Sequence, residues 1–308
     1  MLKRTITGAC ILAVLIPLIA IDHPVAEIGF LICGIVLSII AGYEMIRAFA
    51  TNIPTLKGLK YLVPFMCGLI VFMCYLTTTK GLDLNDPNEQ AFVYHFSGVV
   101  VFVACCIICI GFTLFVKGST ANDMCASVLT LTYCGLIMGY AISIRYFTPI
   151  HETELYIAAG RSFGYVYVIC IFTDVFAYLC GSKFGRHRLC PDISPKKSVE
   201  GAIAGLIFGG VFGTIALFCF NIINVEILSK TQIVVFGLIG FVISCFLSVT
   251  VQMGDLIASK IKRTFGIKDY GKIFPGHGGV LDRFDSLIFS GACFYIIAQM
   301  IQLLVIAR

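Results

Sequence analysis

The sequence contains no tryptophan, and only 13% of its 308 residues are charged. Without tryptophan, any anchors at a membrane–water interface must be Tyr, Phe, Lys or Arg. So little charge beside 59% hydrophobic residues argues against a soluble domain. No basic stripe with stacking aromatic residues is present, so the net charge of +5 indicates contact with anionic lipid rather than with nucleic acid.

Long apolar runs, each sufficient to cross a lipid bilayer, recur along the chain. About nine spans are predicted, at residues 5–22, 24–46, 59–79, 92–116, 124–146, 162–182, 200–223, 231–254 and 286–307. The run at 5–22 lacks an obvious small-residue cleavage site, so we expect a retained helix rather than a signal peptide. The expected fold is therefore an all-α polytopic integral membrane protein.

Basic residues are distributed unevenly between the loops of this nine-span arrangement. With the N-terminus in the cytosol, all but five of the 22 Lys and Arg residues fall on the cytosolic side. The exceptions are Lys80, Arg145, Lys230 and Arg308 outside, and Arg161 at the start of the sixth span. The positive-inside rule therefore predicts an N-in, C-out topology with the polar loops in the cytosol. The sequence does not distinguish a bacterial inner membrane from a eukaryotic endomembrane.

The 15 cysteines indicate neither a metal site nor a disulfide framework. Most lie within apolar runs, where cysteine behaves as a small hydrophobic residue. Cys106 and Cys109 form a Cys-x-x-Cys pair, but it lies within a span and has no second pair. We therefore expect these cysteines to be structural.

The two halves of the chain differ in where their charge lies. Residues 1–150 carry few charges in the spans, which is typical of lipid-facing scaffold helices. Residues 151–308 contain most of the acids within spans and most of the basic loop residues. No Gly/Ser-rich or Pro-rich linker separates the halves, so we predict one continuous membrane domain with a catalytic C-terminal half.

The densest polar cluster lies between Ser259 and Asp285. Within it, Asp282 and Asp285 are three residues apart and would share a helix face. Glycines around His277 leave backbone amides free to wrap an anion, and the many Lys and Arg residues supply counter-charge. Carboxylates that can hold a divalent cation beside a phosphate cradle are typical of nucleotide chemistry.

This segment resembles, without a gap, the signature of the phosphatidate cytidylyltransferases, also called CDP-diacylglycerol synthases. The matching positions are Ser259, Lys262, Arg263, Lys268, Asp269, Gly271, Pro275, His277, Gly278, Gly279, Asp282, Arg283 and Asp285. The resemblance implies transfer of a cytidylyl group from CTP to phosphatidic acid in the lipid bilayer, with release of pyrophosphate, in phospholipid biosynthesis. Because members are commonly dimeric, it also implies a homodimer, while the charge distribution places the active site on the cytosolic side.

A further acid, Asp174, lies within the sixth predicted span, where an unpaired carboxylate costs several kcal/mol. One interpretation is a structural ion pair with Arg161 or with a neighbouring helix. The other is a site residue, since an Asp before Ala177-Tyr178 is also a feature of the family. Val175 departs from the family, whose members often have a hydroxyl residue there.

The loop before the seventh span, Ser194 to Gly201, also resembles the family. Ser198 is predicted to cap the helix and Glu200 to lie in its first turn. Lys197 adjoins this helix N-terminus, a position suited to phosphate, and is expected to contact the triphosphate.

Asp255, Ser259 and Lys262 would share one helix face at spacings of four and seven residues. Compensation of charge at a helix end is the alternative, and for Asp282 and Asp285 the alternative is N-terminal capping. His277 is expected to belong to the anion-binding loop, as a donor to phosphate or as an orienter of a carboxylate. Glu27 and Glu44 have no partner pattern and are expected to be structural.

These interpretations assign three sets of roles. The predicted catalytic residues are Asp255, Asp282, Asp285 and His277. The predicted substrate-binding residues are Lys197, Ser259, Lys262, Arg263, Lys268, Gly278, Gly279 and Arg283. The predicted ligands of a divalent cation, expected to be Mg²⁺, are Asp174, Asp255, Asp282 and Asp285.

Two other functions remain open from the residues alone. A related CTP-dependent transferase could act on another lipid phosphate, such as a polyprenyl phosphate. An ion-coupled transporter also places acids and bases at broken helices, but it predicts inverted repeats and charge near the membrane midplane. Here the charge gathers at the predicted cytosolic ends of the spans, which favours the enzyme.

Overall fold

The computed structural model describes residues 8, 13–21, 23–51, 58–80, 98–147, 159–222, 229–274 and 278–306. The chain divides into two compact units. The first unit comprises residues 1–146 and 261–284, and the second comprises residues 147–260 and 285–308. The boundaries at 260/261 and 284/285 fall within the helices Lys230–Thr264 and Leu281–Ile306. The segment from Ser259 to Asp285 therefore contributes residues to both units.

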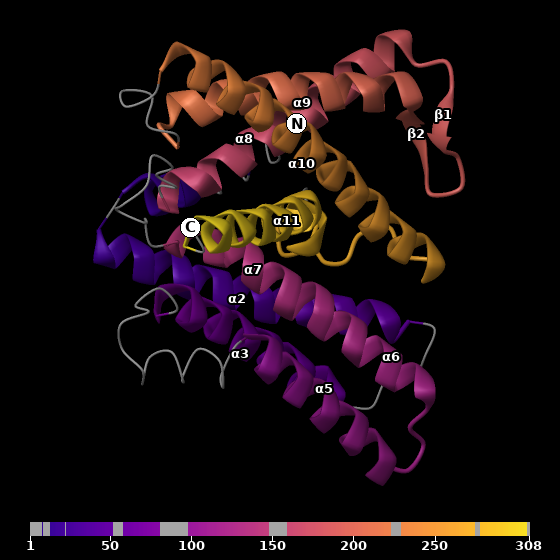
Figure 1. Ribbon diagram of the computed structural model, residues 1–308. Coiled ribbons are helices and arrows are strands. Elements are labelled where there is room, and N and C mark those ends of the chain that lie inside the picture. The colour runs from indigo at the N-terminus through magenta and orange to yellow at the C-terminus, as the bar shows by residue number, and fades with distance from the viewer. Residues whose placement is uncertain are drawn as a thin grey trace. The chain divides into compact units, whose positions relative to one another are not determined.

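The first unit is built from apolar helices. They are α2 (Pro24–Phe49), α3 (Leu59–Lys80), α5 (Gly98–Phe115) and α6 (Ala121–Thr130), continued by η1 (Leu131–Ile137), α7 (Met138–Ser143) and η2 (Ile144–Tyr146). His23 caps α2 by accepting a hydrogen bond from the Val25 amide, and Pro24 occupies the first turn, where its missing N–H costs nothing. Figure 1 shows α2, α3 and α5 running alongside the α6–α7 segment.

The helix that runs from α6 to η2 is interrupted by a π-helical stretch, η1. Such wide turns redirect backbone carbonyls away from the usual partners. The Ser38 hydroxyl donates to the Cys134 carbonyl at 2.6 Å, and the Cys67 thiol lies 3.7 Å from the Thr130 carbonyl. Side chains of α2 and α3 therefore satisfy backbone groups at this irregular segment.

The second unit contains α8 (Ala159–Phe184), α9 (Val199–Cys219), most of α10 (Lys230–Thr264) and most of α11 (Leu281–Ile306). Buried hydroxyl groups connect these helices. The Thr173 hydroxyl on α8 donates to Ser248 on α10 at 2.8 Å. Cys170 Sγ on α8 lies 3.2 Å from Ser290 Oγ on α11. These contacts position the acids of the second unit.

Glycines spaced four residues apart let α9 approach α8 and α10 closely. Gly205 faces the Thr173 carbonyl oxygen, which would lie 2.8 Å from an added Cβ. At Gly209, an added Cβ would collide with the hydroxyls of Thr173 and Ser248. Small residues at helix contacts are the usual means of close packing in membranes.

Replacing Gly209 by alanine is expected to lower the stability of the second unit by about 1–3 kcal/mol, because the new methyl group meets a packed hydroxyl pair. The matched control is Gly111→Ala in α5, where an added Cβ meets nothing within 4 Å. We expect that control to be neutral or stabilising by up to about 1 kcal/mol. Thermal unfolding in detergent measures both, and equal stability of Gly209→Ala and wild type would contradict the packing argument.

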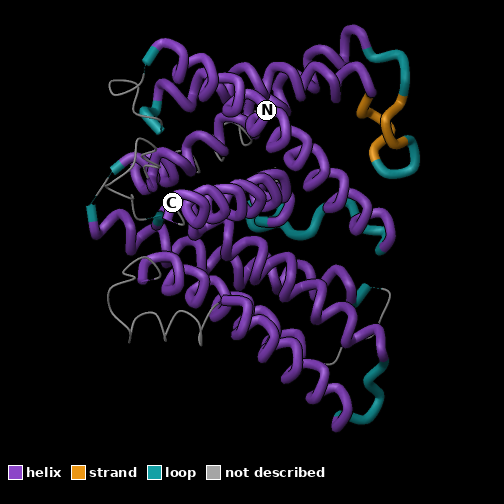
Figure 2. The backbone as a smooth tube through the Cα atoms, in the orientation of Figure 1, coloured by secondary structure: helices purple, strands orange, loops and turns teal. Residues whose placement is uncertain are grey.

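A two-stranded antiparallel hairpin connects α8 to α9, so the described part of the chain is not purely helical. Its strands are β1 (Arg188–Cys190) and β2 (Ser194–Ser198), with Arg188 opposite Ser198 and Cys190 opposite Ser194. Figure 2 shows it at the ends of α8 and α9. The Glu200 carboxylate accepts hydrogen bonds from the Arg186 and His187 amides and thus holds the turn that enters the hairpin.

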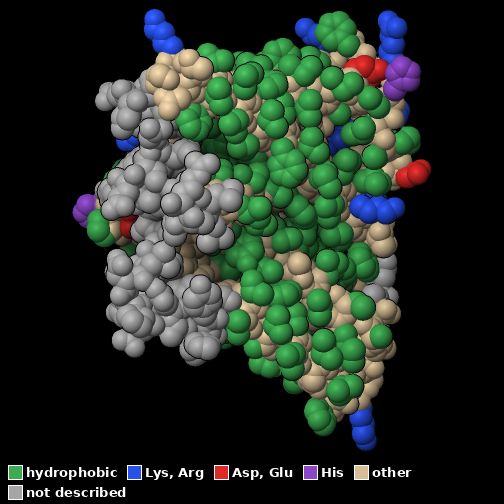
Figure 3. Space-filling view, viewed as in Figure 1, with side chains coloured by type: hydrophobic (Ala, Val, Ile, Leu, Met, Phe, Trp, Pro, Cys, Tyr) green, Lys and Arg blue, Asp and Glu red, His purple; other side chains and the backbone are tan. Residues whose placement is uncertain are grey.

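In the described residues, eight helices are long and apolar enough to cross a membrane. They correspond to eight of the nine predicted spans. Of the remaining span, 5–22, the structure describes residues 8 and 13–21, and residues 13–20 are helical. The all-α polytopic membrane fold is therefore confirmed. Figure 3 shows hydrophobic side chains covering the visible sides of the helices, with Lys and Arg at the margins. The N-in, C-out orientation stays a prediction.

Candidate active site

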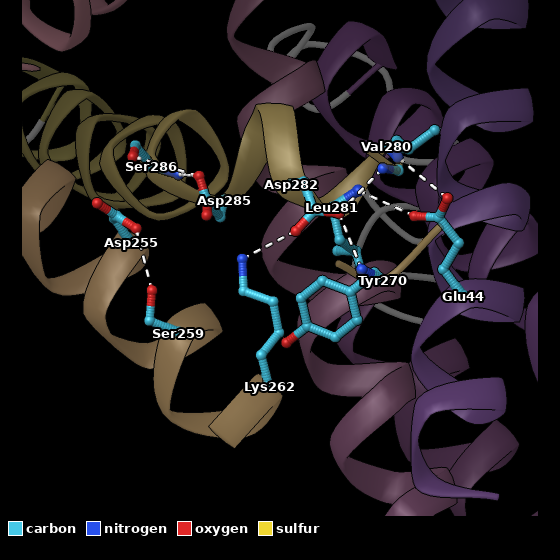
Figure 4. Close-up of polar contacts among 11 residues, drawn as sticks. Glu44, Asp255, Ser259, Lys262, Tyr270, Val280, Leu281, Asp282, Asp285 and Ser286 are labelled. Atoms are coloured by element: carbon cyan, nitrogen blue, oxygen red, sulfur yellow. Dashed lines mark hydrogen bonds and ion pairs between the residues drawn. The ribbon is translucent and has the colours of Figure 1, made fainter. Parts of the chain in front are cut away.

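In the first unit, Asp282 on the first turn of α11 is the centre of a polar cluster. Its Oδ1 accepts a hydrogen bond from Lys262 Nζ at 2.8 Å. Its Oδ2 accepts from the backbone amides of Tyr270 and Gly279, each at 2.9 Å. Only 3% of the Asp282 side chain is exposed. Both carboxylate oxygens are therefore occupied by donors of the signature segment itself (Figure 4).

Lys262 reaches this cluster from the cytosol-facing end predicted for α10. Its side chain is 12% exposed, and its ammonium group lies 5.5 Å from the centre of the Tyr270 ring. Gly266, at a φ of 67°, ends the helix in the left-handed region, and the Ile267 amide donates to the Lys262 carbonyl at 3.0 Å. The helix end and the ion pair thus fix Lys262 together.

A second carboxylate enters the first-unit cluster from α2. Glu44 is 3% exposed, and its two oxygens accept from the Val280 and Leu281 amides at 3.2 and 3.1 Å. These amides belong to the start of α11, where backbone donors have no partner within the helix. Figure 4 shows Glu44 pointing from α2 at this start. Sequence reasoning treated Glu44 as structural, since no local pattern connects it with residues 236 positions away.

The glycines of the signature segment are required for different geometric reasons. Gly278 has a φ of 88°, a conformation that side chains disfavour. Gly279 and Gly271 adjoin the Glu44 carboxylate so closely that a Cβ on either would collide with it. The amide of Gly279, a glycine predicted to wrap an anion, donates to Asp282 here, and the next two amides donate to Glu44. Substrate contact by Gly278 and Gly279 stays a prediction.

In the second unit, Lys197 and Asp255 form a partly exposed ion pair. Lys197 Nζ lies 2.5 Å from Asp255 Oδ2, and the two side chains are 30% and 32% exposed. Lys197 belongs to β2, just before the helix α9 that Ser198 caps through the Gly201 amide. Asp255 and Ser259 share a face of α10, with their side-chain oxygens 3.4 Å apart. The predicted cap at Ser198 is confirmed.

Two further acids belong to the second unit. Asp174 on α8 is exposed and lies within electrostatic range of Asp255 and Lys197. Asp285 on α11 is 8% exposed, and its Oδ1 accepts from the Ser286 amide at 2.8 Å. The α10 backbone approaches α11 here, since a Cβ at Gly254 would lie 2.7 Å from the Asp285 carbonyl oxygen. Three packed helices therefore carry these acids.

The other predicted residues are placed as follows. Arg263, Lys268 and Arg283 are exposed. His277 lies outside the described residues. No group of three or more His, Cys, Asp or Glu side chains within the described ranges is arranged to hold a metal ion. The structure thus brings together two separate clusters: Lys262 with Asp282 and Glu44 in one unit, and Lys197 with Asp255 and Asp174 in the other.

Comparison with known protein families decides what kind of protein carries these clusters. A family model described as the cytidylyltransferase family matches residues 2–301. The chain belongs to this family. The match covers nearly the whole chain, so both clusters lie within it, as does α2 with Glu44.

Curated relatives of this cytidylyltransferase support the assignment. The phosphatidate cytidylyltransferase of Bacillus subtilis (strain 168) is 29% identical over 292 residues, which cover 94% of each chain. That of Aquifex aeolicus (strain VF5) is 31% identical over 236 residues, covering 74% of this chain and 80% of the relative. That of Staphylococcus haemolyticus (strain JCSC1435) is 42% identical over 142 residues, which cover 44% of this chain and 50% of the relative.

Proposed function

We propose that this multi-pass membrane protein is a phosphatidate cytidylyltransferase that converts CTP and phosphatidate into CDP-diacylglycerol and pyrophosphate. The observation that carries this proposal is the similarity to a phosphatidate cytidylyltransferase over 94% of both chains. The ion pair between Lys197 and Asp255 supports it, because Lys197 lies in the Ser194–Gly201 loop that resembles the family and both side chains are about one-third exposed.

The reaction needs no protein nucleophile. An oxygen of the lipid phosphate monoester attacks the α-phosphorus of CTP, and the bond from that phosphorus to the bridging oxygen of the β-phosphate breaks. Pyrophosphate leaves with the electron pair of the broken bond. Both substrates are anions, so positioning and charge neutralisation supply most of the catalysis.

The residues of the second unit are suited to those tasks. Lys197 adjoins the N-terminus of α9, where backbone amides and the helix dipole favour anions, so we assign it to the triphosphate. The exposed carboxylate of Asp174 and the partly exposed carboxylate of Asp255 fit Mg²⁺, which in proteins is bound by one or two carboxylates together with waters and substrate phosphates. Such an ion would supply charge stabilisation to the transferring phosphoryl group. Asp285 is also assigned to the carboxylates that would hold this ion.

Two residues of the first unit, Asp282 and Lys262, are assigned a supporting role. Asp282 occupies both of its oxygens with Lys262 and two backbone amides, so it orders the signature loop. The exposed Arg263, Lys268 and Arg283 are assigned to the neutralisation of substrate phosphates. We further propose that the protein forms a homodimer, to be tested by its mass in detergent.

The lipid acceptor is tested with purified protein, CTP and a series of lipid phosphates. We expect a CDP-lipid product with phosphatidate and Mg²⁺, with one pyrophosphate released per product, and none after chelation with EDTA. A product with polyprenyl phosphate but none with phosphatidate would replace the proposed acceptor by the other lipid while leaving the transfer chemistry in place.

The side of the membrane is proposed from the basic residues. We place the N-terminus and the 183–197 and 260–283 segments in the cytosol, since cytosolic loops carry an excess of Lys and Arg. A reporter inserted near Arg188 should therefore lie in the cytosol, and one fused after Arg308 on the opposite side. Detection of both reporters on one side would contradict the nine-span arrangement.

A further inference from the structure

The carboxylate of Glu44 makes an unusual long-range contact for a membrane helix. It accepts two successive backbone amides, those of Val280 and Leu281, from a segment 236 and 237 residues later. With 3% of the residue exposed, water cannot substitute for it. Removing the carboxylate would leave these two buried amides without the acceptor that they have here. A buried donor without an acceptor costs its full desolvation free energy.

Two glycines of the signature make room for this carboxylate. Cβ atoms built at Gly271 and Gly279 would both collide with Glu44 oxygens, and the Gly271 position would also lie 3.1 Å from the Gly279 Cα. The two glycines therefore enclose the Glu44 carboxylate between backbone segments. The lack of a side chain at these two positions therefore makes room for the contact with α2, apart from any conformational freedom that it gives the loop.

The C-terminal end of α2 also contacts residues 265–270 of the signature segment. Arg47 Nη2 donates to the Tyr270 carbonyl at 3.5 Å, and the Thr51 hydroxyl donates to the Phe265 carbonyl at 3.2 Å. The Phe49 and Phe265 rings pack edge to face with centroids 4.8 Å apart. Glu44 is thus the innermost contact of a docking surface formed by residues 44–51.

The contact lies next to the Asp282 cluster. Glu44 binds the amide of Leu281, the first residue of α11, and Asp282 is the next residue. Asp282 in turn binds Lys262 and the Gly279 amide. Any rotation of the first turn of α11 would therefore displace the Asp282 oxygens from both donors.

We propose that Glu44 is a positioning residue for the cytidylyl transfer. It fixes the start of α11, and through it Asp282 and Lys262, without contacting either substrate. This inference rests on the proposed function for its kinetic consequence only. The ordering of residues 278–282 by Glu44 is a property of the protein whatever reaction it performs.

Glu44→Gln is the sharpest variant, because it keeps the size of the side chain but leaves one acceptor oxygen for two amides. Glu27→Gln, the same change at the other acid of α2, is the matched control. We expect kcat of Glu44→Gln to fall roughly 10-fold or more, as loss of a hydrogen bond to a charged group predicts. The KM for CTP should stay within about 2-fold, because Lys197, which we assign to the triphosphate, belongs to the second unit and is unchanged.

Hydrogen exchange of the purified protein separates positioning from general stabilisation. In Glu44→Gln the amides of residues 278–282 should exchange roughly 10-fold faster, while those of α3 keep the wild-type rate, because local opening and global unfolding are distinct. Unchanged kcat, or equal acceleration in α3, would overturn the proposal. If Glu44→Gln does not yield folded protein, the same measurements on Glu44→Asp decide.

The experiments distinguish failure of the proposed function from failure of the positioning role of Glu44. Wild-type protein that makes no CDP-diacylglycerol would overturn the proposed function, while the exchange rates would still test Glu44. Wild-type activity together with an inert Glu44→Gln substitution would overturn only the positioning role.

Discussion

Replacing Asp255 by asparagine is expected to lower kcat by about 10²-fold or more, the usual cost of removing a main electrostatic contributor. The substitution preserves size but removes the charge that Lys197 contacts at 2.5 Å and that Mg²⁺ would need. Because the pair is about one-third exposed, its loss should change the free energy of unfolding by less than about 1 kcal/mol. Steady-state kinetics and thermal unfolding of the same preparation measure the two effects.

Asp192→Asn provides the matched control for charge, since Asp192 lies exposed at the turn of the β1–β2 hairpin. It should retain wild-type turnover. A paired test of the neighbouring lysines sharpens the assignment: Lys197→Ala should raise the KM for CTP or lower kcat, while Lys196→Ala, at an exposed position, should do neither. Near-normal turnover of Asp255→Asn at saturating Mg²⁺ would return Asp255 to a structural role.

Asp282→Asn is expected to affect stability as well as turnover. The substitution leaves the Lys262 ammonium group buried without its counter-charge, and breaking such a pair from one side costs about 3 kcal/mol or more. Asparagine also offers one acceptor oxygen where aspartate serves three donors. We expect a markedly lower melting temperature in detergent, together with a large loss of kcat.

A double-mutant cycle with Lys262→Met isolates the ion pair. Because the methionine removes the unpaired charge, Asp282→Asn combined with Lys262→Met should be less destabilised than the sum of the two single variants by about 1 kcal/mol or more. Additive effects on the free energy of unfolding would show that the pair contributes nothing. In that case the effect of Asp282→Asn would come from the backbone amides alone.

The helices could be predicted from the sequence because apolar runs of sufficient length permit few other structures in a membrane. The run predicted at 59–79 is α3 at Leu59–Lys80, and the predicted cap at Ser198 is confirmed. The β1–β2 hairpin was not predicted. Its five-residue second strand, Ser194–Ser198, contains two lysines and a proline, so no strand pattern distinguishes it from a loop.

The candidate site was only partly predictable for a physical reason. Local spacing placed Asp255 and Ser259 on one helix face, and the structure has their oxygens 3.4 Å apart. Spacing could not identify Lys262 as the partner of Asp282, or Glu44 as the acceptor for α11, because tertiary packing brings these groups together. A buried acid in an apolar span was the available signal for Glu44, since such residues are expensive to keep.

The central claim is cytidylyl transfer to phosphatidate, and CTP labelled at one phosphate at a time tests it most directly. Purified protein is incubated with phosphatidate, Mg²⁺ and CTP labelled at either the α- or the γ-phosphate, and the lipid is extracted into chloroform. We predict that α-label enters the lipid while γ-label stays in water as pyrophosphate. Label from the γ-position in the lipid, or lipid free of both labels, would contradict the account.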